Sequence, residues 1–96
     1  MKKMAIIICN VSSLEVVTQL VKRFKTDFYQ IVMPTTGLLP FGEPRMNNAV
    51  WPGYSVSIIF KMDAEDLIKL RASLTTYNAD CPTEDEQAVL ESWTID

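Results

Sequence analysis

The apolar residues of this chain follow two spacings, one typical of strands and one typical of helices. Met4–Cys9 is rich in isoleucine and apolar at both odd and even positions, which indicates a central strand covered on both faces. Phe28–Met33 would be a second strand, with Tyr29, Ile31 and Met33 on one face and Phe28 and Val32 on the other. Tyr54–Met62 alternates more clearly, with the two-residue period of a half-buried strand. In Tyr54–Met62 one side is wholly apolar and the other carries Ser57 and Lys61, so we expect the apolar side to face the core.

Two segments have the spacing of amphipathic helices. Ser12 and Glu15 form a capping-box pattern that would begin the first helix. The second would begin after Asp63 as N-cap and continue to about Leu74. The positions expected to face the core are Val16, Val17, Leu20, Val21 and Phe24 in the first helix, and Ala64, Leu67, Ile68, Leu70 and Leu74 in the second.

The C-terminal segment permits two interpretations. Asn78–Glu86 is acidic and rich in turn-forming residues. Ala88–Ile95 would be a strand with Val89 and Trp93 on one face, or a short helix that begins at the capping-box pattern in Thr83–Glu86. We favour the strand, because the first strand needs a partner.

The order strand, helix, strand, strand, helix, strand predicts one α+β domain over residues 1–96. It is the order of a ferredoxin-like βαββαβ sandwich, in which an antiparallel sheet carries two helices on one face. The other face of the sheet would also be apolar, and another subunit is the simplest way to bury it. The pattern therefore predicts a homo-oligomer.

Residues 34–53 interrupt this regular pattern. All three glycines and four of the five prolines of the chain fall within them, which opposes regular structure. We interpret the segment as a long insertion between the second and third strands, and its apolar residues as a surface that docks a partner protein. The docking residues would be Leu38, Leu39, Phe41, Arg45 and Met46. The alternative is that these side chains fold back onto the core of their own or a neighbouring subunit.

Composition excludes several classes of protein. The formal charge of −3 opposes nucleic-acid binding, and the absence of histidine removes Ser-His and Cys-His nucleophile pairs. The longest apolar run is too short for a membrane span or a secretory signal, so we expect a cytoplasmic protein without direct membrane insertion. Cys9 and Cys81 form no C-x-x-C motif, and we expect both to be free thiols. We expect no enzyme, cofactor or metal site.

The long insertion and the segment Val50-Trp-Pro-Gly-Tyr54 resemble the nitrogen-regulatory PII superfamily and its PII-like bacterial signalling proteins. The resemblance implies a homotrimer with small-molecule effector sites between subunits, at the base of a partner-binding T-loop. The matching residues here are Thr35, Thr36 and Gly37 at one end of the insertion and Trp51, Pro52 and Gly53 at the other. It also implies a partner protein, for which a membrane transporter is one class.

The chain departs from the family where PII proteins grip nucleotide phosphates. That region of the family is glycine-rich and basic, whereas Asn78–Glu86 has no glycine and four carboxylates, which would repel phosphate. Asp80, Glu84, Asp85 and Glu86 could instead ligate a divalent cation, as in a trimer similar to the CutA proteins. A structural oligomer without a ligand is a third interpretation.

Overall fold

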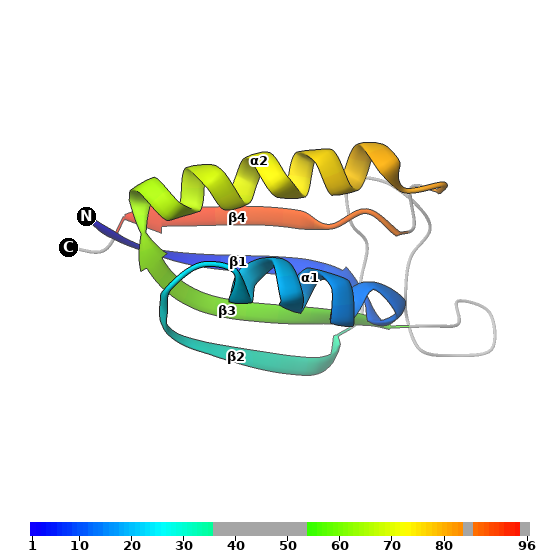
Figure 1. Cartoon of the computed structure of the whole chain (residues 1–96). Helices are drawn as coiled ribbons and strands as arrows, with labels where there is room; N and C mark the ends of the chain where they lie inside the picture. Colours follow the sequence, from blue (N-terminus) through cyan, green and yellow to red (C-terminus); the bar gives the residue numbers. More distant parts are fainter. Residues whose placement is uncertain (36–53, 84–85, 95–96) are drawn as a thin grey trace.

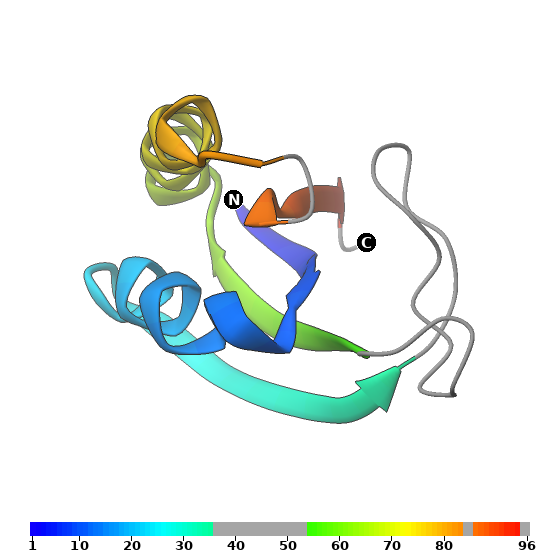
Figure 2. The same cartoon turned by 90° about the vertical axis from the view of Figure 1, so that its right-hand side faces the viewer.

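A computed structural model describes residues 1–35, 54–83 and 86–94 of the chain. Its elements are β1 (Lys2–Asn10), the 3₁₀ helix η1 (Val11–Ser13), α1 (Leu14–Lys22), β2 (Thr26–Thr35), β3 (Ser55–Asp63), α2 (Ala64–Asp80) and β4 (Val89–Thr94). The strands form one sheet in the order β2-β3-β1-β4, with every pair antiparallel. Both helices lie on the same side of this sheet (Figures 1 and 2). The predicted ferredoxin-like βαββαβ fold is confirmed.

The core lies between the helices and one face of the sheet. Alternate residues of β1 and β3 point into it, and the register pairs Ala5 with Phe60 and Ile7 with Ile58. The helices contribute leucine and valine side chains to the same layer. The buried residues that pack together are Ala5, Ile7, Cys9, Val17, Leu20, Val21, Ile58, Phe60, Met62, Leu67, Leu70, Leu74, Ala88 and Leu90. The two-residue period predicted for β3 is thus confirmed.

Two of the residues predicted for the core are exposed. Val16 on α1 is 50% exposed and Ile68 on α2 is 71% exposed. In each helix the buried positions form a narrower stripe than predicted, because each helix contacts the sheet along a single line and a residue next to that line turns outward. Val16 borders a cleft that is described below, whereas Ile68 faces solvent.

The two helices also begin and end differently from the prediction. The Asn10 side chain accepts a hydrogen bond from the Ser12 backbone N–H at 3.1 Å and begins η1, so the predicted Ser12 cap is wrong. The second helix was expected to end near Leu74, but α2 continues to Asp80. Asn78 lies in this added turn, where its side chain binds the backbone ahead of β4.

Strand β2 extends past the predicted start of the insertion. Pro34 and Thr35 belong to the strand, and the Thr35 backbone is paired with Ser55 of β3. A register shift separates Val32 from Thr35, and β2 is an edge strand of the sheet. An edge strand with a bulge tolerates proline, because the missing N–H is not needed there for a ladder hydrogen bond. The expected start of the irregular segment at Pro34 is therefore wrong by two residues.

Residues 88–95 were expected to form either a strand or a helix, and β4 confirms the strand over Val89–Thr94. Its register with β1 places Val89 opposite Ile8 and Trp93 opposite Met4, on the sheet face that the helices do not cover. Among the described residues, no helix is both long enough and apolar enough to cross a membrane.

Candidate functional site

Most of the predicted site residues lie outside the described residues. This holds for Thr36, Gly37, Trp51, Pro52 and Gly53 of the expected effector site and for Leu38, Leu39, Phe41, Arg45 and Met46 of the expected docking surface. Thr35 is placed as the last residue of β2. The expected roles of all these residues stay predictions.

The two ends of the insertion meet at one end of the sheet. Thr35 closes β2 and its backbone is paired with Ser55, the first residue of β3. The Val11 backbone N–H donates a hydrogen bond to the carbonyl oxygen of Tyr54 at 3.2 Å. The base of the insertion is therefore joined directly to η1, which follows β1.

A cleft with a volume of ≈ 280 Å³ lies beside η1, at the same end of the domain. We call it the helix-end cleft, because its lining residues come from η1, the start of α1 and the end of α2. These helix ends lie at the same end of the domain (Figure 1). The residues that line it are Ser12, Ser13, Val16, Tyr77, Asp80, Cys81, Pro82 and Glu86. Its size is near the lower end of the range for small-molecule pockets.

One backbone carbonyl group holds the sides of the cleft together. The Glu86 carbonyl oxygen accepts hydrogen bonds from the Ser13 hydroxyl at 3.1 Å and the Tyr77 hydroxyl at 3.2 Å. The Cys81 thiol also donates to it, at 3.5 Å. These bonds join η1, the last turns of α2 and the segment that leads to β4. Ser13 is buried, so its hydroxyl needs this partner.

A second set of hydrogen bonds fastens the end of α2 to the start of β4. The Asn78 side chain donates to the Ala88 carbonyl oxygen at 2.9 Å and accepts from the Ala88 backbone N–H at 2.8 Å. The side-chain amide thus bonds both backbone polar groups of Ala88, as the backbone of a neighbouring strand would. The Gln87 side chain donates to the Asn78 carbonyl oxygen at 3.3 Å. Together these bonds explain why α2 continues beyond Leu74.

The helix-end cleft is electrostatically negative. Asp80 is the last residue of α2 and Glu86 follows in the next segment, while none of the lining residues is basic. The C-terminus of a helix already carries partial negative charge, to which the Asp80 carboxylate adds. Burial, the largest effect, raises the pKa of the Tyr77 phenol. Within the described part of the chain neither carboxylate has an ion-pair partner.

The uncovered face of the sheet is the second candidate surface. In its middle, Ile6 of β1 lies between Ile59 of β3 and Glu91 of β4. Phe28 and Val32 on β2 and Trp93 on β4 are 41%, 45% and 50% exposed. The other residues near its middle are Met4, Ile8, Gln30, Ser57, Lys61 and Val89, and Lys2, Asn10, Ser55 and Asp63 lie toward its ends. The face therefore has an apolar middle and polar ends.

The alternative of a divalent-cation site concerned Asp80, Glu84, Asp85 and Glu86. Glu84 and Asp85 lie outside the described residues. In the described part of the chain, no three acidic or cysteine side chains come close enough together to bind a metal ion. Cys9 is buried and Cys81 half-buried, and no disulfide joins them in the structure.

Sequence reasoning identified the acidic residues of the helix-end cleft but missed the cleft itself. Asp80 and Glu86 were interpreted as carboxylates that would repel phosphate or ligate a cation, and Tyr77 was assigned no role. The pairing of Ser12 and Ser13 with the far end of α2 depends on the whole fold, since Ser13 and Glu86 are 73 positions apart. A polar helix end beside a Cys-Pro pair is the one local signal, and many helix ends share it.

Comparison with known proteins gives structural neighbours only. No family model matches the chain, and no curated protein matches it by sequence. Among solved structures, CPII of Thiomonas intermedia K12 bound to ADP and bicarbonate superposes with a TM-score of 0.75 at 18% identity, covering 96% of this chain and 83% of CPII. CPII, described as a nitrogen-regulatory PII-like protein, bound to ADP, AMP and bicarbonate gives a TM-score of 0.74 at 19% identity, covering 98% and 89%.

A protein of Thermus thermophilus, described as a PII-like signalling protein, gives a TM-score of 0.62 at 14% identity, with 96% of this chain and 84% of that chain covered. The chain has the fold of PII-like proteins. The resemblance seen in the sequence is thus confirmed at the level of structure. At these identities the similarity establishes the fold and leaves the function to be argued from the chain's own residues.

Proposed function

We propose that this chain is a non-enzymatic, PII-like regulatory protein of the cytoplasm. It assembles as a homotrimer, binds a small-molecule effector in clefts between subunits, and engages a partner protein through the insertion at 34–53. The observation that carries the proposal is the match to the PII-like fold along nearly the whole chain, 96% of it against CPII. CPII was solved with ADP and bicarbonate, which supports a small-molecule effector here.

The uncovered sheet face supports the assembly. It presents Ile6, Ile59 and Trp93 together, and a monomer would leave this apolar surface in water. Burying apolar surface contributes about 25 cal/mol per Å². Contact between copies along this face would remove Phe28 and Val32 from water as well.

Changes in the effector site would act on the insertion as a switch. The proposed effector residues Thr35, Thr36 and Gly37 precede the docking residues, and Trp51–Gly53 follow them. An effector that binds one arrangement of the insertion more tightly shifts the population toward that arrangement. The docking residues would then engage or release the partner, for which a membrane transporter is one candidate class.

Analytical ultracentrifugation tests the assembly. The wild-type protein should sediment at three times the monomer mass. Ile6→Glu puts a charge in the middle of the uncovered face and should yield monomers. Ile68→Glu is the matched control, because Ile68 is already 71% exposed on α2, and it should remain trimeric. If the wild-type protein is monomeric at micromolar concentration, the proposed trimer is contradicted.

Ligand and partner binding are tested separately. A ligand that binds only the native state raises the melting temperature, so a thermal-shift series with ADP, AMP and bicarbonate should include at least one that does so. Deleting residues 38–46 should leave a trimer that no longer retains the partner that the wild-type protein captures from membrane and soluble extracts. Equal capture by the deletion variant would exclude the insertion as the docking surface.

A further inference from the structure

We infer that, in the trimer proposed above, Glu91 of each copy forms an ion pair with Lys61 of the next copy around the ring. The inference rests on the proposed assembly and goes beyond it, because it names the contact that fixes how neighbouring copies are oriented. It depends on the two charged side chains that interrupt the apolar middle of the uncovered sheet face.

The middle of this face divides into two flanks of opposite charge. Its rows run across the sheet through Met4, Ile6 and Ile8 of β1. In these rows the flank formed by β1 and β4 carries Glu91, and the flank formed by β2 and β3 carries Lys61. The other residues that the register places in these rows are uncharged. In a ring of identical copies, one flank of each copy meets the opposite flank of the next, so a negative flank would meet a positive one.

Glu91 needs a partner once the face is covered. In the single protomer its side chain is exposed and lies next to Ile6 on the neighbouring strand. Among the described residues it has no ion-pair partner. A second copy packed over Ile6 would take water away from this carboxylate, and burying an unpaired charge is strongly unfavourable. Copies can therefore pack closely here only where one of them supplies a cation to Glu91.

Lys61 is the cation best placed to meet Glu91. Of the lysines that the register places on this face, Lys2 lies at one end and already contacts both Asp27, at 2.9 Å, and Asp63, at 3.4 Å. The Lys61 ammonium group lies 3.8 Å from Asp27, its one ion-pair contact within the described chain. An ammonium group has three N–H donors, so Lys61 can bond a second carboxylate. It also lies one row from Glu91, on the opposite flank.

A charge swap followed by analytical ultracentrifugation tests the inference. Glu91→Lys and Lys61→Glu each place like charges together, and each should raise the protein concentration at half-assembly at least about tenfold. The double variant, with both substitutions, restores opposite charges at every contact and should assemble nearly as tightly as the wild type. It shares with the single variant any local repulsion between position 61 and Asp27, so that repulsion cannot account for the recovery.

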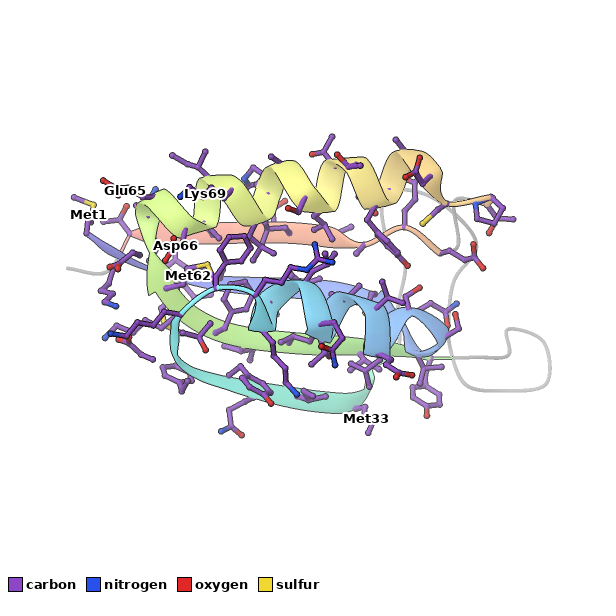
Figure 3. The ribbon with its side chains drawn as sticks, in the orientation of Figure 1. Met1, Met33, Met62, Glu65, Asp66 and Lys69 are labelled. Atoms are coloured by element: carbon purple, nitrogen blue, oxygen red, sulfur yellow. The ribbon has the colours of Figure 1, made fainter. Side chains whose placement is uncertain are left out.

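Glu65→Lys and Lys69→Glu are the matched controls. They make the same two charge changes at exposed positions near the start of α2, in the helix layer rather than on the uncovered face (Figure 3). Each should assemble as the wild type does. Far-UV circular dichroism of every variant establishes that a loss of assembly does not come from unfolding.

Mixing the two single swap variants in equal amounts tests the ring. Two kinds of subunit cannot alternate around a ring of three, so one contact of like charge always remains, and the mixture should assemble less tightly than the double variant. A mixture that forms dimers as readily as the double variant forms trimers would overturn the ring arrangement. If the wild type is trimeric but Glu91→Lys assembles equally well, or if the double variant does not recover, the ion pair is wrong and the trimer stands. A monomeric wild type would contradict both.

Discussion

Replacing Asn78 with alanine should destabilise the domain severely, although Asn78 lies near the end of a helix. Its side chain is the partner of both backbone polar groups of Ala88, with bonds of 2.9 and 2.8 Å, and Ala88 is only 3% exposed. Leaving a buried polar group without a partner costs about 1–3 kcal/mol. Two such groups, partly compensated by entering water, give an expected loss of about 2–4 kcal/mol out of a total of about 5–15.

Urea unfolding, followed by far-UV circular dichroism, measures this loss as a lower midpoint with an unchanged slope. Thr76→Ala is the matched control on the same helix. The Thr76 hydroxyl donates to the Ala72 carbonyl oxygen at 3.3 Å in an exposed position, so its removal should change the free energy of unfolding by less than about 0.5 kcal/mol. Measurements at two protein concentrations separate this loss from any change in assembly.

Asn78→Asp sharpens the test. Its ionised carboxylate can accept from the Ala88 N–H but faces the Ala88 carbonyl oxygen without a proton to donate, so at neutral pH it should be about as unstable as Asn78→Ala. Once protonated, the carboxyl group can donate, and the deficit relative to the wild type should shrink as the pH falls. A loss below about 0.5 kcal/mol for Asn78→Ala would refute the assigned role of these bonds.

Three further predictions concern pH and packing. Burial raises the pKa of the Tyr77 phenol above its ordinary 10.0, so its contribution to stability is complete below that pH and is lost as the pH rises through the raised pKa; Tyr77→Phe should lack this alkaline loss in urea titrations. A hydrogen bond from Lys2 lowers the pKa of Asp27 below 3.8, so its contribution is lost as the pH falls through the lowered value; Asp27→Asn should show a shallower acid loss. Phe60→Ala should cost about 3–5 kcal/mol by calorimetry, because Phe60 is fully buried.

The strands could be predicted because their signal is local and strong. In β3 the alternation of apolar and polar residues follows the observed faces, and Val56, Ile58, Phe60 and Met62 are all completely buried. The choice of a strand over residues 89–94 came from a topological requirement, namely a partner for β1, rather than from propensity. The sequence was therefore sufficient to predict a strand here, because the βαββαβ order leaves β1 without a second partner otherwise.

The helices were predicted less exactly, because their limits depend on distant contacts. The capping box at Ser12 and Glu15 competed with Asn10, whose side chain begins η1 one turn earlier. The last turn of α2 depends on the bonds between Asn78 and Ala88, which no helix propensity reveals. Burial of one stripe position and exposure of the next depends on the angle at which the helix crosses the sheet.

The helix-end cleft likewise combines a local signal, which the sequence shows, with contacts between distant residues, which it does not show. The acidic residues near the end of α2 are visible in the sequence, but a cleft requires an opposite wall, and that wall comes from η1. The Glu86 carbonyl oxygen joins Ser13 and Tyr77 across the fold, while Val11 joins the same turn to Tyr54. The short turn after β1 therefore contacts both the cleft and the base of the insertion. Any displacement of η1 must strain or break one of these bonds, which makes this turn the physical link between the two parts of the domain.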